Sequence, residues 1–304
     1  MDTFPQIRED EFCYIPQYSL REFIIPIVVA FLVISFGSLP YIYGYSIADD
    51  QKVFMGLVGK GTSGTNGYLM FLRQTVEGDR WHRNQCTPEK IDKPYINIEW
   101  WVLGKFARLL QLSVLQFFHL DRCFAVFFFV FSLYFLLITV LNSSYERIFC
   151  FLLIVFGSGL GWIIWMVNHY FNLNLPLSWD VQGTQIFGYL VNKPHFIRGF
   201  ALAILMYAFF IRGFQTGKPF YFVVSGVVAL LHSFMRPFLI PESYLACIIF
   251  PLLYCWRVKK LEMKWFLLSA LPAIISLPGV LYYIWLTIAD PLGMRGWSEY
   301  HQFL

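Results

Sequence analysis

Long apolar runs separated by short polar segments form the pattern of this chain. Residues 23–45 carry no charged side chain. Comparable runs occupy residues 123–145, 148–167, 196–211, 220–235, 237–256 and 265–289. A helix needs roughly 20 apolar residues to cross a membrane. The pattern therefore predicts an all-α, polytopic transmembrane helix bundle of about 7–8 spans, forming one transmembrane domain over residues 1–304.

Residues 97–112 allow two interpretations. Trp100 and Trp101 stand near one end, but Lys105 and Arg108 lie inside the segment. It fits either a short crossing or a helix that lies at the membrane interface. We favour the interfacial helix, because a crossing here would invert the second half of the chain relative to the orientation that follows.

The orientation of a membrane protein follows the excess of Lys and Arg in its short cytoplasmic loops. Residues 257–264 and 212–219 are the best such loops in this chain. If both face the cytoplasm, the loops 46–96 and 168–194 lie on the outer side. The first of these loops is long and polar, and we expect it to carry interfacial helices.

Composition supports a membrane protein and limits its partners. Charged residues make up 14% of the chain, against about 25% in soluble domains. The net charge of +4 and the lack of a long basic run give no reason to expect nucleic acid as a partner. The six cysteines form no C-x-x-C pair and predict no metal site. We expect a multi-pass protein of the cell membrane, specifically of a bacterial inner membrane. Membrane lipid is then one of its partners.

Several motifs suggest a family. They are "LPYIYGY", "VFMGLV", "YLMFLRQTVEGDRW", "WWVLGKFARLLQLS", "FHLDR" and "NKPHFIRGFALAI". Together with the order of a first span, a long outer loop and many further spans, the chain resembles a bacterial branch of the GT-C glycosyltransferases. The resemblance implies transfer of a sugar from a polyprenyl-phosphate donor to an acceptor at the outer membrane face. It leaves a divalent metal ion open as a cofactor.

The chain departs from that family in two respects. The stretch "GTSGTNGY" holds no acidic residue before Tyr68, where the family usually presents one. GT-C enzymes are also usually longer, so we expect the chain to be truncated at its C-terminus.

Asp49 and Asp50 are the candidate catalytic residues. A glycosyl transfer needs a base to take the acceptor proton, or a carboxylate that orients the hydroxyl or holds a metal. Two adjacent acids at the outer end of the first span could supply it. The alternative is a solvated loop beside the lipid headgroups.

Three groups of basic residues could bind the phosphate of the donor. Arg80 and His82 lie in "EGDRWHR", which could also be part of an amphipathic helix on anionic headgroups. The second group lies around the start of a predicted helix and could instead snorkel to the interface. Its members are Lys193, His195 and Arg198.

The third group, His232, Arg236 and Glu242, lies inside a long apolar region. Ionisable groups at membrane depth usually face a cavity or a partner. Pro237 and Pro241 interrupt the helix there, as happens where backbone lines a cavity. Arg236 with Glu242 could also be only a structural ion pair.

Two other functions fit the sequence. A transporter or flippase of a lipid-linked anion would need His232 and Arg236 but no catalytic acid. A non-catalytic membrane subunit would need neither, and the missing acid before Tyr68 favours it.

Overall fold

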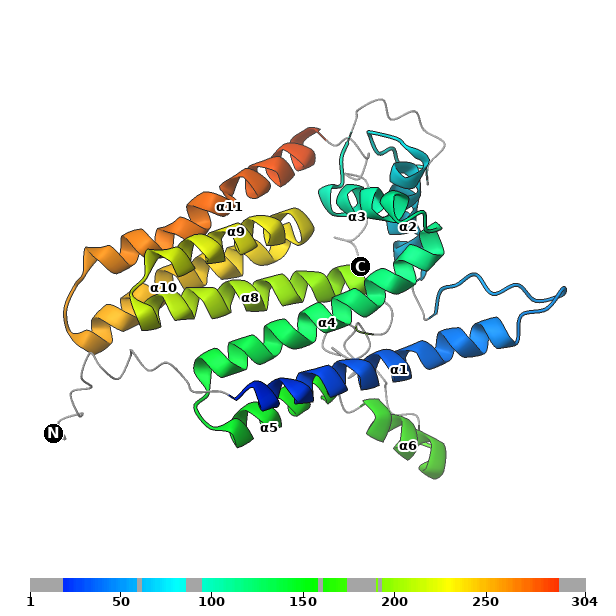
Figure 1. Ribbon diagram of the computed structural model, residues 1–304, viewed down its shortest axis with the longest axis horizontal. Helices are drawn as coiled ribbons and strands as arrows, with labels where there is room; N and C mark the ends of the chain where they lie inside the picture. Colours follow the sequence, from blue (N-terminus) through cyan, green and yellow to red (C-terminus); the bar gives the residue numbers. More distant parts are fainter. Residues whose placement is uncertain are drawn as a thin grey trace. The chain divides into compact units, whose positions relative to one another are not determined.

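Helices account for all regular structure in the part of the chain that the computed structural model describes, which comprises residues 19–58, 62–85, 95–157, 161–173, 190 and 193–289. Five of them are long and apolar enough to cross a membrane (Figure 1). They are α1 with its preceding 3-10 turn (Leu20–Ser46), α4 (Val114–Val140), α8 (Pro194–Thr216), α10 with the turn before it (Pro237–Val258) and α11 (Met263–Ala289). The expected all-α fold with helices that could span a membrane is confirmed. The number of crossings stays a prediction.

The chain divides into two compact units that interleave in sequence. The α1 unit contains the described residues of 12–58 and 121–216. The α11 unit contains those of 59–120 and 217–304. The polypeptide passes between the units within α4, and the single transmembrane domain expected from the sequence stays a prediction.

The core of the α1 unit is built from α1 (Ile24–Ser46), α4, α5 (Ser144–Phe156) and α8. These helices bury their apolar faces against one another, with Phe129, Val130 and Phe151 completely enclosed. Val29, Ala30 and Val33 contribute the α1 side at spacings of three and four residues, as expected for one helical face.

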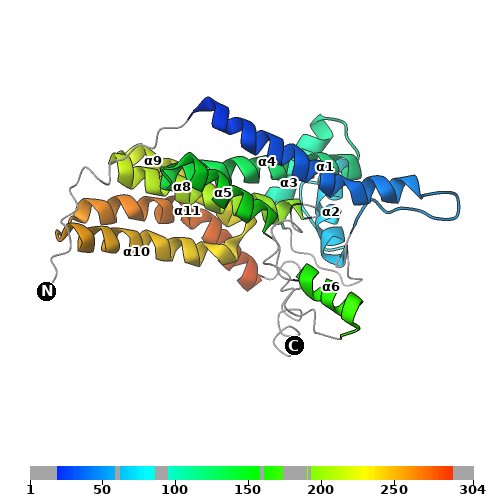
Figure 2. The same ribbon diagram turned by 90° about the horizontal axis from the view of Figure 1, so that it is seen from below.

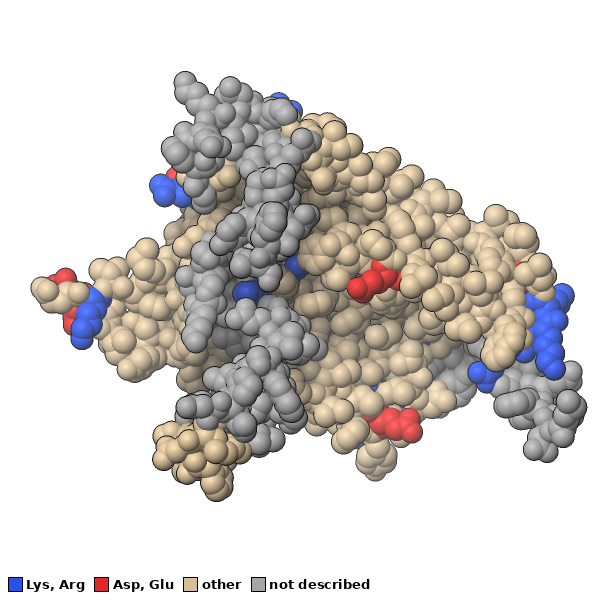
Figure 3. Space-filling model, turned by 180° about the vertical axis from the view of Figure 1, so that it is seen from behind, with Lys and Arg blue, Asp and Glu red and all other residues tan. Residues whose placement is uncertain are grey.

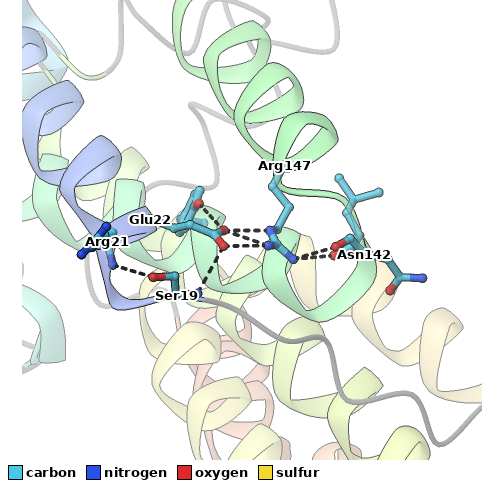
Figure 4. A network of polar contacts seen from close by, with 7 residues as sticks. Ser19, Arg21, Glu22, Asn142 and Arg147 are labelled. Carbon is cyan, nitrogen blue, oxygen red and sulfur yellow. Dashed lines mark hydrogen bonds and ion pairs between the residues drawn. The ribbon is translucent and has the colours of Figure 1, made fainter.

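A polar network fixes the start of α1 to the start of α5 (Figure 4). Arg147 holds the Glu22 carboxylate through Nε and Nη2, at 2.8 to 3.1 Å, and donates from Nη1 to the carbonyls of Leu141 and Asn142. Tyr134 also donates to Glu22, at 3.2 Å. The buried guanidinium is thereby fully engaged, so this network acts as a structural tether.

In the α11 unit, α9 (Pro219–Met235), α10 (Ile240–Val258) and α11 lie side by side (Figures 1 and 2). Small residues allow α9 and α11 to approach closely. A Cβ at Gly226 would lie 2.6 Å from Cδ1 of Ile275, and one at Gly279 would overlap the Ser233 side chain. Close approach of backbones at small residues is the usual way in which membrane helices associate.

The remaining helices of this unit, α2 (Thr62–Glu77) and α3 (Ile98–Leu109), pack on each other. Twelve residues at about 1.5 Å each reach roughly 18 Å, less than the roughly 30 Å of a bilayer core. The length of α3 therefore fits the interfacial interpretation of residues 97–112. The apolar face of α2 packs inside the protein, because Phe71 and Leu72 are buried against α3 and Tyr95.

Two spans differ from those expected. α4 begins at Val114, nine residues early, and takes "FHLDR" into the helix. The expected run 148–167 is not one helix, since α5 ends at Phe156 and α6 (Gly161–Phe171) begins beyond it. Gly157 ends α5 in an extended conformation, with ψ at 105°. The outer loop 168–194 falls largely outside the described residues.

The exposed surface is poor in charged side chains and rich in apolar ones, as expected of a protein surrounded by lipid. Uncharged side chains cover most of the described surface visible in Figure 3, and charged ones form separate patches. Large apolar side chains along α11 are exposed, among them Leu267, Ile274 and Leu281. On a membrane-spanning helix such side chains contact lipid.

Candidate functional site

The α11 unit contains a break between two helices at the point where the sequence predicts a cavity. α9 ends at Met235, and Arg236 has φ −140° and ψ 66°, outside the helical region. Pro237 follows and cannot continue the hydrogen-bond pattern, because it has no N–H. A short turn, Pro237–Leu239, then leads into α10. The backbone N–H of Arg236 still bonds to the His232 carbonyl, at 2.7 Å.

His232 and Arg236 lie one helical turn apart and both are buried. His232 is completely enclosed, and within the described part of the chain neither of its ring nitrogens has a hydrogen-bond partner. Arg236 is 6% exposed, and its guanidinium lies 5.1 Å from the Phe238 ring centre. Glu242, in the first turn of α10, is exposed. The structure thus brings together two of the three residues predicted here.

Residues that the sequence did not single out complete this polar region. Glu99, in the first turn of α3, is only 6% exposed. Tyr68 of α2 stacks on Trp100, with ring centres 5.4 Å apart. Burial raises the pKa of the Tyr68 hydroxyl, Arg236 opposes that shift and Glu99 reinforces it. Tyr68, Glu99 and Arg236 therefore share one electrostatic environment.

Two tyrosines of α11 connect this environment to the neighbouring elements. The Tyr283 hydroxyl donates to the carbonyl of Phe234 at 2.7 Å, and it interacts electrostatically with Glu99 and Arg236. The Tyr282 hydroxyl donates to the carbonyl of Ile96, just before α3. α2, α3, α9 and α11 therefore all contribute to one buried polar region, which we call the α11 site: Tyr68, Glu99, His232, Arg236 and Tyr283.

His82 is buried in a separate network beside α2. Its Nδ1 accepts the Asn97 N–H at 2.9 Å, so Nε2 carries the proton and donates to Thr75 Oγ1 at 2.8 Å. Burial lowers the pKa of His82 to about 4. Both ring nitrogens are thus used inside the protein.

Arg80 lies in the same loop as His82 but is exposed, with its guanidinium 5.9 Å from the Trp81 ring centre. The loop follows the end of α2, where Gly78 has φ +111°. The segment "EGDRWHR" is therefore not a continuous amphipathic helix, and it directs Arg80 and His82 to different surroundings.

Asp49 and Asp50 are exposed in a tight turn after α1. Asp49 Oδ1 accepts the N–H groups of Gln51 and Lys52, each at 2.8 Å. The backbones of Asp49 and Lys52 also bond to each other. The Asp49 carboxylate therefore stabilises the turn.

The basic residues near the start of α8 lie in the α1 unit. Arg198 forms a buried ion pair with Asp121 of α4, a residue that the sequence did not single out. The neighbouring Arg122 donates to the Gly37 carbonyl and to Ser38 Oγ on α1. Asp121 neutralises the charge of Arg198. The pair therefore acts as a contact between α4 and α8 and does not offer Arg198 as a free charge for a phosphate.

His195 and Lys193 flank the ring of Phe196 at the start of α8. His195 is buried with its ring against Phe196, and Lys193 Nζ lies 5.4 Å from the centre of the same ring. The predicted site residues thus fall into both units: Asp49, Asp50, Lys193, His195 and Arg198 in the α1 unit, and Arg80, His82, His232, Arg236 and Glu242 in the α11 unit.

Within the described ranges, no three acidic, histidine or cysteine side chains lie close enough together to hold a metal ion. The described residues therefore offer no ligands for the divalent metal ion that the resemblance left open. The chain matches no protein-family model, no curated protein and no solved structure.

Proposed function

We propose that this chain is a membrane glycosyltransferase that takes a sugar from a polyprenyl-phosphate donor, and that the α11 site holds the donor phosphate. The observation that carries the proposal is the pair of buried residues at the break between α9 and α10. Arg236 supplies a permanent positive charge, and guanidinium donors match phosphate oxygens. The His232 ring nitrogens, which no described residue engages, supply a further donor.

The surroundings fit a lipid-linked substrate. The break interrupts helices whose outer faces carry exposed apolar side chains, such as Leu231 and Leu245. A polyprenyl chain can remain in the bilayer along such faces while its phosphate enters the protein. The ring of Tyr68, which is only partly buried, is the kind of aromatic surface on which a sugar can stack. The motif resemblance to GT-C enzymes supports sugar transfer as the reaction.

The test is transfer of radiolabelled sugar from a panel of polyprenyl-phosphate sugars by the full chain in proteoliposomes. We expect label to leave the lipid fraction, and Arg236→Gln to reduce the rate at limiting donor about 10- to 100-fold. That range corresponds to the roughly 1.5–3 kcal/mol of a charge-assisted hydrogen bond. Arg257→Gln, at the exposed end of α10, is the matched control. Equal rates for both variants would remove Arg236 from the donor site.

A transporter or flippase of a lipid-linked anion is the second candidate. It is favoured by the position of Asp49, whose carboxylate is engaged in an exposed turn. The same proteoliposomes separate the two functions. A flippase moves the labelled lipid between leaflets and leaves the sugar–phosphate bond intact, whereas the proposed transferase cleaves it.

A further inference from the structure

We infer that Glu99 is the catalytic base of the α11 site, in place of Asp49 or Asp50, and that it takes the proton of the acceptor hydroxyl. This inference rests on the proposed function. Glu99 is a described carboxylate that is buried and influences the same tyrosines as Arg236, although no sequence pattern singles it out.

Three contacts of neighbouring residues connect the segment around Glu99 to the end of α9. Trp100, the next residue, stacks on Tyr68. Ile96, three residues before it, accepts the hydroxyl hydrogen of Tyr282. The adjacent Tyr283 bonds to the carbonyl of Phe234, two residues before Arg236. The first turn of α3 is therefore connected through α11 to the break at the end of α9.

Buried groups of opposite charge contribute to this region. Arg236 provides the positive charge and Glu99 the negative charge, and the hydroxyls of Tyr68 and Tyr283 interact with both. A base must lie within hydrogen-bond reach of the attacking hydroxyl, on the side away from the leaving group. Asp49, by contrast, is exposed and accepts two backbone N–H groups within its own turn.

In the proposed reaction, each bond that forms is matched by a bond that breaks. The acceptor hydroxyl gives its proton to the Glu99 carboxylate while its oxygen forms a bond to C1 of the sugar. The bond between C1 and the phosphate oxygen breaks, and its electron pair leaves with the polyprenyl phosphate. Arg236 stabilises the additional negative charge on that phosphate. Glu99 then releases its proton to solvent.

A purely structural role for Glu99 is the competing interpretation, since a buried carboxylate also offsets the charge of Arg236. The two roles differ in measurable ways. A structural Glu99 would affect folding and donor binding, whereas a base would affect turnover and its dependence on pH.

The experiment compares Glu99→Gln with wild type in the transfer assay, with donor binding and thermal unfolding measured on the same preparations. We expect turnover to fall at least 100-fold, while the donor dissociation constant changes less than threefold. The acidic limb of the pH–rate profile, which reports a base that must be ionised, should disappear. Glu99→Asp should recover part of the rate. Glu146→Gln, an exposed carboxylate in the first turn of α5, is the control.

Two results would overturn the inference. Near-wild-type turnover of Glu99→Gln, with loss in Asp49→Asn or Asp50→Asn, would return the role of base to the turn after α1. A wild type that transfers no sugar from any donor would remove the proposed function as well. The first result leaves the proposed function intact, so the two failures are distinguishable.

If Glu99→Gln does not fold, chemical labelling of the wild-type protein can test the role of Glu99. Dicyclohexylcarbodiimide, an apolar reagent, modifies protonated carboxyl groups in apolar surroundings, so the reaction is run at a pH on the acidic limb of the pH–rate profile, and peptide mass spectrometry locates the product. We expect Glu99 to be labelled, and saturating polyprenyl phosphate to block the labelling. A Glu99 that is not labelled, or that is labelled equally with and without the lipid, contradicts its place in the donor site.

Discussion

At the scale of single residues, His82 provides a test of the loop between α2 and α3. Its ring must stay neutral, because Nδ1 accepts the Asn97 N–H. Burial holds the pKa of His82 at about 4, against 6.5 in an unfolded chain. The resulting stabilisation is complete above pH 6.5 and is lost as the pH falls toward 4, amounting to about 3 kcal/mol by linkage.

The measurement is thermal unfolding in detergent between pH 4 and 8 for wild type and His82→Gln. Glutamine can accept from Asn97 and donate to Thr75 without titrating. We expect the variant to lose less stability than wild type on acidification. His169→Gln, at an exposed position of α6, should leave the wild-type dependence unchanged. Parallel curves for wild type and His82→Gln would contradict the neutral, buried ring.

At the scale of elements, the contact between α2 and α3 depends on Gly104. A Cβ at this position would overlap Cβ of Thr75 and lie 2.7 Å from its Cγ2. Gly104→Ala should therefore destabilise the protein by about 1–3 kcal/mol through overpacking. Gly67→Ala is the matched control on α2, where nothing lies within 4 Å, and it should be neutral or stabilising by up to about 1 kcal/mol. Similar unfolding temperatures for both variants would show that the helices do not meet at Thr75.

The buried ion pair between Asp121 of α4 and Arg198 of α8 provides a second test, because it should contribute to the stability of the protein. Asp121→Leu or Arg198→Met leaves one buried charge without its partner and should cost about 3–5 kcal/mol. The double variant should recover most of that loss, because an apolar pair can replace a buried ion pair. A double variant as unstable as the sum of its single variants would show that the two side chains do not act as a pair.

Several of these elements could be predicted from the sequence and others could not. The break after α9 was predictable, because Pro237 follows ionisable residues in an apolar run. The Asp121–Arg198 pair was not, since 77 residues separate its members and no periodicity relates them. The span expected from the sequence begins at residue 123, two residues after Asp121, whereas α4 includes Asp121. Glu99 was missed because its segment reads as an interfacial helix with two tryptophans.

At the scale of the whole molecule, we propose a phosphate site in the α11 unit of a multi-pass membrane protein. Five described helices have the length and composition of membrane spans. In the described part of the α11 unit, Arg236 is buried at the end of α9 and Glu99 is buried in the first turn of α3. In the proposed function, a lipid-linked phosphate would reach Arg236 while its hydrocarbon chain stays in the bilayer.

The most direct test of that claim is binding of undecaprenyl phosphate to the full chain, measured by native mass spectrometry from detergent. We expect one bound lipid phosphate per chain, and a 10- to 100-fold weaker affinity for Arg236→Gln than for wild type or Arg257→Gln. Undecaprenol, which lacks the phosphate, should not compete. Equal affinity of Arg236→Gln and wild type, or effective competition by undecaprenol, would contradict a phosphate site at the break between α9 and α10.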